Sequence, residues 1–243
     1  MPGKAPQIDT SNEPLFFYMP DAEYGEFCQW YPSPFRVSKA EIASLIADNS
    51  SLDDGSEGKN NNGSTASAIA TTNATTATAT VTTTGTNTAP KKAKSEPQNP
   101  REGEEETILF NCAEQFMMYN KASRFHDTAT TQRIMAESSP KIQKQLGKNT
   151  HGFYAASWDE VKFDVVVAGN MAKFGQNPKL RRKLLCTGER MLVEASSRDR
   201  VWGVGFTAKH ALQHRNQWGE NLLGKALMAV RERLRGVELE EGG

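Results

Sequence analysis

The sequence predicts an α+β domain that is predominantly helical, with a few short strands near its N-terminus and a long disordered insertion. Three observations support this fold class. Short apolar runs rich in aromatic residues occur early in the chain, several segments with helix start and stop signals follow residue 111, and the composition changes abruptly between about residues 39 and 106. We therefore expect one domain built from residues 14–38 and 107–236, with flexible residues at 1–13 and 237–243.

The strands are expected where large apolar and β-branched residues are concentrated over a few positions. These short segments are Leu15–Met19, Phe35–Val37, Thr107–Phe110 and Met191–Ala195. Residues 14–38 are too few to bury a core of their own, so their strands must belong to the same domain as the later helices.

The insertion is dominated by Ser, Thr, Asn, Ala and Gly and contains almost no large apolar residues over 49–88. Such a segment cannot offset its ordering entropy by burial, and we expect disorder. Residues 40–47 are compatible with a short helix, because Ile42, Leu45 and Ile46 fall on one side. Lengthening a five-residue hairpin loop to about 65 residues costs only ~2 kcal/mol in closure entropy. The basic run Lys91–Lys94 reads either as a solvated charge run or as a nuclear-import signal.

Five helices are predicted after the insertion. Asn111 caps a helix through about Phe125, and Pro140 and Gly147 bracket a second. The third helix begins at a Ser157–Glu160 capping box and the fourth at Asn177–Pro178. The fifth begins near Asn221, and its amphipathic pattern continues to Gly236.

The overall composition excludes several functions. Lys and Arg together equal Asp and Glu, at 29 each, so no bulk charge draws the chain to nucleic acid or a membrane. The first residues lack the apolar run of a secretory signal, and no run approaches the ~20 apolar residues of a membrane span. Three widely spaced cysteines and four scattered histidines favour neither a disulfide framework nor a metal site. We expect a cytoplasmic protein, with the nucleus as the alternative, that needs no metal or cofactor.

Several ordered segments together resemble the NADAR domain, or YbiA-like, family. They cover nearly everything outside the first dozen residues and the insertion. The matching segments are Tyr24–Phe27, Tyr31–Phe35, Cys112–Ala122, Trp158–Lys162, Lys173–Asn177, Leu184–Gly188, Leu192–Ala195, Arg198–Gly205 and Trp218–Met228. The resemblance implies a compact, largely helical YbiA-like domain that hydrolyses N-glycosidic bonds.

The resemblance also implies two substrate groups: ribosylamino-pyrimidine phosphates of riboflavin synthesis, and ADP-ribose attached to guanine, which we favour slightly. The partner is thus a small-molecule or nucleobase-linked ribosyl substrate, with nucleic acid as one carrier of ADP-ribosyl-guanine. A non-catalytic module that binds ADP-ribose or NAD is the alternative. The sequence indicates no membrane partner and no particular oligomeric state.

Three positions depart from the family pattern. Many members have Ser-Asn-Phe where this chain has Cys28, Gln29 and Trp30, and many have Arg where it has Lys148. The lysine replaces a bidentate phosphate clamp with a point charge. Bacterial relatives often have Asp where Val204 stands, so that position is not a required acid here.

Glu114 is the first candidate catalytic residue. On a helix its neighbours are Met117 and Met118, so its carboxylate faces an apolar site that would raise its pKa. The competing interpretation is structural, because Glu114 stands three residues after Asn111 and completes a capping box.

Asp199 is the second catalytic candidate, for orienting ribose hydroxyls or activating water, although Asp residues in turns commonly bond only to nearby backbone. Trp158 and Lys162 share a helix face that suits a base above a phosphate, or form an ordinary packing pair. Trp202 offers an aromatic wall beside the backbone. The remaining candidate substrate-binding residues are Gly205, Lys148 and Asn221, the last at the start of the final helix.

Overall fold

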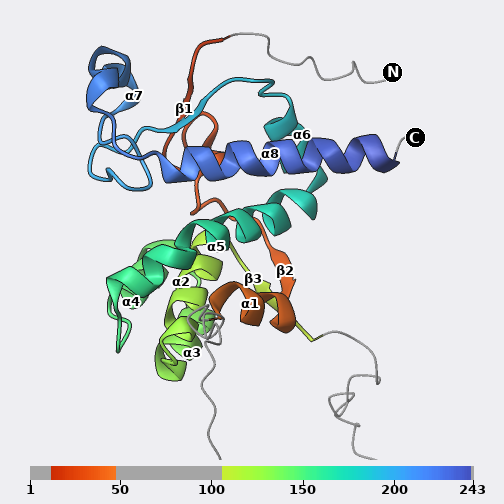
Figure 1. Ribbon diagram of the computed structural model, residues 1–243, viewed down its shortest axis with the longest axis vertical. Coiled ribbons are helices and arrows are strands. Elements are labelled where there is room, and N and C mark those ends of the chain that lie inside the picture. Colours follow the sequence, from red (N-terminus) through yellow and green to blue (C-terminus); the bar gives the residue numbers. More distant parts are fainter. Residues whose placement is uncertain (1–11, 48–105, 242–243) are drawn as a thin grey trace, which may run out of the picture. The chain divides into compact units, whose positions relative to one another are not determined.

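The computed structural model describes residues 12–47 and 106–241, which form the domain discussed below (Figure 1). The longer helices are α1 (Lys39–Ile46), α2 (Ala113–Arg124), α3 (Thr128–Ala136), α4 (Pro140–Lys148), α5 (Ala155–Gly175), α6 (Pro178–Leu185) and α8 (Leu222–Glu241). Shorter helical segments are η1 (Gly25–Phe27), α7 (Ala208–Ala211) and η3 (Leu212–Gln217). The predicted fold class, a predominantly helical α+β domain, is confirmed.

In the described part of the chain, four short strands form two separate pairs. Strand β1 (Leu15–Phe17) lies parallel to β4 (Leu192–Glu194), with Leu15 opposite Leu192. Strand β2 (Phe35–Ser38) runs antiparallel to β3 (Thr107–Phe110). The segments before and after residues 48–105 therefore join in one ladder.

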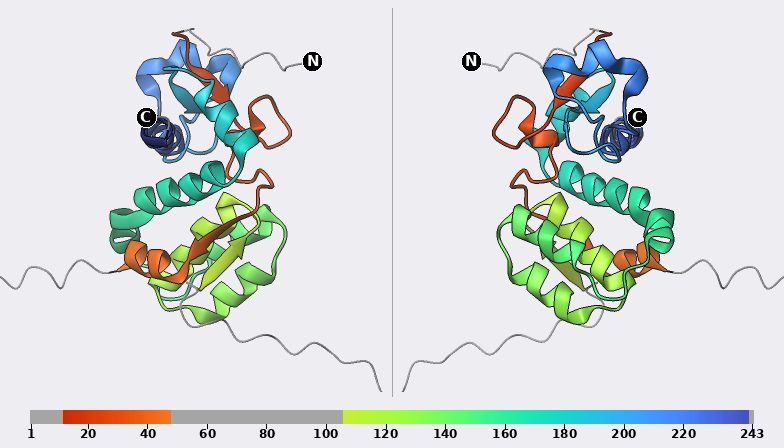
Figure 2. Two further views of the ribbon diagram at one scale, coloured as in Figure 1. Left: turned by 90° about the vertical axis from the view of Figure 1, so that its right-hand side faces the viewer. Right: turned by 90° about the vertical axis from the view of Figure 1, so that its left-hand side faces the viewer.

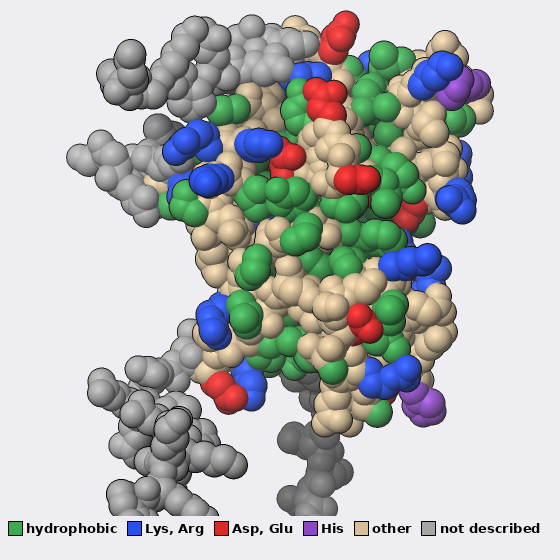
Figure 3. Space-filling model, turned by 180° about the vertical axis from the view of Figure 1, so that it is seen from behind, with side chains coloured by type: hydrophobic (Ala, Val, Ile, Leu, Met, Phe, Trp, Pro, Cys, Tyr) green, Lys and Arg blue, Asp and Glu red, His purple; other side chains and the backbone are tan. Residues whose placement is uncertain are grey.

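Helix α5 lies at the centre of the domain. It contacts α1, α2 and β2 on one side and α8 on the other, so it joins the two strand pairs into one packed body. Figure 2 shows this helix between the group containing α2–α4 and the group containing β1 and α8. On the face in Figure 3, acidic and basic side chains are interspersed, as the balanced charge of the chain suggests.

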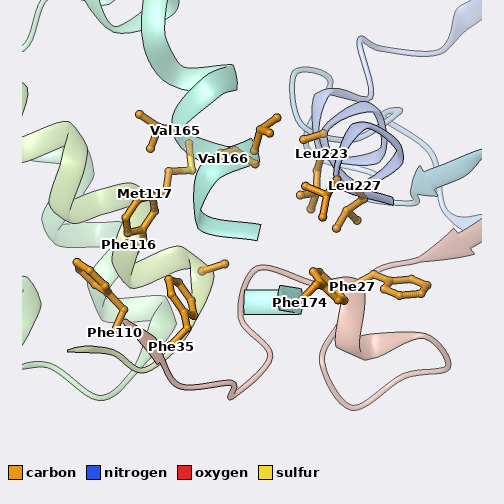
Figure 4. Packing of buried hydrophobic residues seen from close by; sticks show 14 of the residues in the cluster. Phe27, Phe35, Phe110, Phe116, Met117, Val165, Val166, Phe174, Leu223 and Leu227 are labelled. Carbon is orange, nitrogen blue, oxygen red and sulfur yellow. The ribbon is translucent and has the colours of Figure 1, made fainter. Parts of the chain in front are cut away.

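Aromatic residues fill the core on both sides of α5 (Figure 4). Phe35, Phe110 and Phe116 come from three elements, and the ring centroids of Phe110 and Phe116 lie 5.1 Å apart with the rings nearly perpendicular. Further along α5, Phe174 lies 6.1 Å from Phe27, centroid to centroid. Such aromatic contacts add to the free energy gained by burying apolar surface.

Two predicted helix starts are wrong. Cys112, and not Asn111, is the N-cap residue of α2, and the Gln115 side chain accepts a hydrogen bond from the Asn111 backbone N–H at 2.8 Å. This bond replaces the capping box that was one interpretation of Glu114. Helix α5 begins at Ala155, upstream of the predicted cap, because the Ser157 hydroxyl instead accepts a hydrogen bond from Arg124 Nε.

Other element boundaries also differ from expectation. The insertion was expected from residue 39, but Lys39–Ile46 is helix α1, capped by the Ser38 hydroxyl and held through buried Ile42. The final helix was expected to end at Gly236 but continues to Glu241. Helix α3 was not predicted, although the Asp127 side chain caps it by accepting from Thr130 N–H.

The predicted disorder over 49–88 and the basic run Lys91–Lys94 lie outside the described residues, as does most of the expected flexible N-terminus. Within 12–47 and 106–241, no helix is long and apolar enough to cross a membrane.

Two glycines of α8 provide a matched test of how closely this helix packs against β4. A Cβ at Gly224 would lie 2.1 Å from the Leu192 carbonyl oxygen, whereas one at Gly236 would meet nothing within 4 Å. We expect Gly224→Ala to lower the free energy of unfolding by about 2 kcal/mol through overpacking. Gly236→Ala should raise it by up to about 1 kcal/mol through helix propensity. Urea denaturation of both variants measures the difference, and equal effects would contradict the close contact between α8 and β4.

Candidate active site

A pocket of about 630 Å³ opens where several helices, one strand end and three loops of the domain meet. Residues of α2, α4 and α5 line it together with the end of β4 and the loops that precede η1, follow it and follow β4. The lining residues are Tyr18, Met19, Cys28, Gln29, Trp30, Glu114, Met117, Met118, Lys121, Lys141, Lys144, Gln145, Lys148, Trp158, Glu194, Ser196, Arg198, Asp199, Trp202 and Leu223.

Glu114 stands in the first turn of α2 with its side chain in this pocket. Its backbone N–H donates to the Gln29 carbonyl, which joins the helix to the loop that carries Trp30. The residue is only 4% exposed, and its Oε1 is buried without a hydrogen-bond partner among the described residues. Burial raises the pKa of Glu114 to about 7, against the lowering effects of Lys144 and a side-chain hydrogen bond with Trp30. At neutral pH this carboxyl is therefore divided between its two protonation states.

Asp199 lies in the same pocket, on the loop after β4. Its Oδ1 accepts hydrogen bonds from the backbone N–H groups of Val201 and Trp202, at 3.0 and 2.8 Å. The turn bond expected of an Asp at this position is therefore present, and it fixes the carboxylate next to Trp202. Asp199 also raises the pKa of Glu114 by charge repulsion.

Three tryptophans line the pocket. Trp158 from α5 is 6% exposed, and Trp202 follows the Asp199 turn. Trp30 was quoted in the sequence analysis only as a departure from the family pattern, and the structure places it beside Glu114. Flat apolar walls next to a carboxyl suit a heterocyclic base bonded to a ribose.

Lys148 lines the pocket as expected, and further cations accompany it. Lys141, Lys144 and Lys148 are spaced three and four residues apart on α4, which places them on one face. Lys121 from α2 lines the pocket too and lies 3.9 Å above the Phe153 ring centroid. Burial and nearby Lys148 lower the pKa of Lys121. Such a positive rim suits a phosphorylated ligand.

Lys162 is absent from the pocket lining. Its Nζ lies 2.7 Å from Asp159 Oδ1, one helical turn earlier and on the outer surface of α5. The expectation that Lys162 and Trp158 jointly face a ligand is therefore wrong. Lys162 does stand four residues after Trp158, but its amine contacts Asp159 and does not line the pocket.

Gly205 and Asn221 also do not line the pocket. Gly205 has φ of +79° and its Cβ position is closed by Arg200, so its role is in the loop backbone. The Asn221 side chain does not cap α8. Its Oδ1 accepts from the Glu194 N–H at 3.0 Å, and its Nδ2 donates to the Leu192 carbonyl at 2.9 Å. Asn221 thus fastens β4 to the start of α8.

Glu194 is a pocket residue that the sequence analysis missed as a candidate. It ends the short apolar strand β4, and its only signal was an acidic residue within a run otherwise expected to be buried. No group of three or more His, Cys, Asp and Glu residues within the described ranges is arranged to hold a metal ion.

Comparisons with known proteins identify the family of the chain. The NADAR domain profile matches residues 64–235. An N-glycosidase of Acanthamoeba polyphaga mimivirus is 45% identical over 130 residues, which cover 53% of this chain and 76% of the viral protein. N-glycosidase YbiA of Escherichia coli is 34% identical over 116 residues, covering 48% of this chain and 67% of YbiA.

The fold is also similar to a solved structure. The solution NMR structure of the Escherichia coli protein YbiA superposes with a TM-score of 0.57 at 21% identity, covering 96% of this chain and 92% of YbiA. Since more than half of the sequence matches the domain profile, the chain belongs to the NADAR domain family.

Proposed function

We propose that the protein hydrolyses the bond between C1′ of a phosphorylated ribose and a base, with ADP-ribosylated guanine as the favoured substrate. The coarser class rests on its relatives: the viral and bacterial proteins are N-glycosidases, and this chain is likewise an enzyme that hydrolyses N-glycosidic bonds. The observation that carries the substrate proposal is the buried Glu114 carboxyl in one pocket with Trp158 and Trp202.

The chemistry follows from the charge that develops in the reaction. Breaking the C1′–N bond leaves positive charge on C1′ and the ring oxygen, which a nearby carboxylate stabilises. In this mechanism ionised Glu114 stabilises that charge and accepts a proton from the attacking water. Asp199, oriented by two backbone N–H groups, holds the ribose hydroxyls. The indole rings hold the base, and the lysines meet the phosphates.

The size and charge of the pocket favour the larger substrate. A fused purine uses more of the surface offered by Trp30, Trp158 and Trp202 than a single pyrimidine ring does. The lysines come from both α2 and α4, which suits a diphosphate better than one phosphate group. ADP-ribosylated guanine has both features, while a ribosylamino-pyrimidine phosphate has neither.

Mass spectrometry of free-base release tests the proposal. The purified protein is incubated separately with ADP-ribosylated guanine and with a ribosylamino-pyrimidine phosphate. Faster release of guanine supports the favoured substrate, and faster release of the pyrimidine would replace it with the other group. Binding of ADP-ribose without release of any base would instead identify a binding module.

Lys148 should contribute to phosphate binding, with Lys162 as the matched control. We expect Lys148→Ala to raise KM about tenfold to a hundredfold, because a charge-assisted contact is worth roughly 1.5–3 kcal/mol. Lys148→Arg should keep KM close to the wild-type value, since the cation remains. Lys162→Ala removes a lysine of the next helix that does not reach the pocket and should leave KM unchanged. A larger effect at Lys162 than at Lys148 would contradict the placement of the phosphates.

A further inference from the structure

Glu194 presents a second buried carboxyl to the pocket that the mechanism above does not use. Its backbone is fully occupied: the N–H binds Asn221 Oδ1 at 3.0 Å, and the carbonyl accepts from Val204 N–H at 3.0 Å. Its side chain lines the pocket, and Oε2 is buried with no hydrogen-bond partner in the described part of the chain. A strand held this firmly, with a buried and unpartnered carboxyl oxygen at its end, places that acid for a ligand.

The groups around Glu194 favour its neutral form. Burial raises its pKa to about 8, and repulsion from Asp199 and Glu114 adds to the effect, while Lys144 opposes it. The Cys28 thiol also faces this carboxyl, and burial raises the pKa of that thiol to about 11. Burial and the neighbouring carboxyl groups therefore both favour the protonated form of Glu194.

The two carboxyls thus have different surroundings within one pocket. Lys144 and Asp199 act on both groups in the same sense, but Lys148 favours the ionised form of Glu114 only, whereas Glu194 also faces the Glu114 carboxyl. When two carboxyl groups of one site lie in different environments, their pKa values differ. Such pairs commonly act as the acid and the base of one reaction. Base departure requires such an acid, because a purine or pyrimidine leaves poorly as an anion.

We propose that Glu194 is the proton donor to the departing base, a role that rests on the proposed N-glycosidase function. As the C1′–N bond breaks, its electron pair passes to the base and the Glu194 carboxyl proton is transferred to the base. Water forms the new C1′–O bond and gives its proton to the Glu114 carboxylate. The products are the free base and a ribosyl hydroxyl. A proton then returns from Glu114 to Glu194 through solvent, which restores both groups.

The test is the pH dependence of kcat for base release by the wild-type protein and by Glu194→Gln. Wild-type kcat should fall above about pH 8 as the donor ionises. Glu194→Gln should lower kcat about a hundredfold at pH 7, keep KM within about twofold and abolish that high-pH decline. Glu194→Asp should retain the decline with a lower kcat, because its shorter side chain still ionises. Glu220→Gln, an exposed acid outside the pocket, is the matched control and should match the wild type.

The outcomes separate this role from the proposed function. A decline above pH 8 that persists in an active Glu194→Gln protein would overturn the proton-donor role alone, as would a kcat within threefold of wild type. If Glu194→Gln does not fold, Glu194→Asp decides: loss of its high-pH decline would overturn the role. Wild-type protein that releases no base from any ribosyl substrate would overturn the proposed function and this role with it.

Discussion

Replacing Glu114 with Gln is expected to lower kcat about a thousandfold while the protein still binds its ligand. Glutamine keeps the size and most of the packing of Glu114 but cannot ionise, so it neither stabilises the positive ribosyl group nor accepts a proton from water. Removing one well-placed electrostatic contact of this kind costs roughly two to three orders of magnitude in rate. Steady-state measurement of base release at saturating substrate gives kcat, and calorimetric titration with ADP-ribose gives the affinity.

Glu26 provides the matched control for this substitution. It is a buried glutamate, 7% exposed, that pairs with Lys183 and does not line the pocket. Glu26→Gln should therefore leave kcat within about threefold of the wild type, consistent with a residue that makes no transition-state contact. A Glu114→Gln protein that retains a tenth or more of the wild-type kcat would remove Glu114 from the chemistry and leave it a structural residue.

The sequence alone identified those site residues whose side-chain type suits the proposed chemistry. Glu114, Trp158 and the turn that carries Asp199 and Trp202 are far apart in the chain, yet all four residues line one pocket in the structure. An acidic residue next to methionines is an uncommon pattern, and so is a tryptophan next to turn residues. Both patterns could therefore be recognised in the sequence. Their convergence depended on long-range packing around α5, which a residue pattern alone does not specify.

The errors have equally specific causes. Lys162 satisfied the helical spacing to Trp158, but spacing does not reveal that Asp159 pairs with it. Glu194 was missed because a single acid at the end of a three-residue strand gives no periodic signal. Its burial depends on β1 and on Asn221, which lie far from it in sequence. Asn221 itself was read as a helix cap, while its side chain bonds to β4.

The fold, like the site, was predicted only in part. The strand segments were found because each is a compact apolar run, but their pairing could not be predicted, since it joins residues up to 177 positions apart, as with Leu15 and Leu192. The predicted starts of α2 and α5 were misplaced by one and three residues, and neither observed N-cap residue makes a side-chain capping bond. Gln115 took the role expected of Glu114, and that exchange leaves the Glu114 carboxyl available to the pocket.

The same Glu114→Gln substitution should change how stability depends on pH. A carboxyl with a pKa raised from 4.5 to about 7 in the folded protein binds protons more tightly there than in the unfolded chain. Its destabilising effect is therefore absent below about pH 4.5, grows between pH 4.5 and 7, and is complete above pH 7. The full effect is about 3 kcal/mol. Glutamine is neutral at every pH and removes this dependence.

Urea denaturation of wild type and Glu114→Gln at pH 4.5 and pH 8 measures the effect. The new amide leaves polar atoms to satisfy, which costs roughly 1–3 kcal/mol, but that cost is the same at both pH values. The difference in unfolding free energy between variant and wild type should therefore rise by about 3 kcal/mol from pH 4.5 to pH 8. Glu26→Gln, which removes a carboxyl that pairs with Lys183 outside the pocket, is the control and should not reproduce this rise. A Glu114→Gln difference that stays constant with pH would mean that Glu114 is hydrated in the folded protein, and the dry carboxyl required for catalysis would be absent.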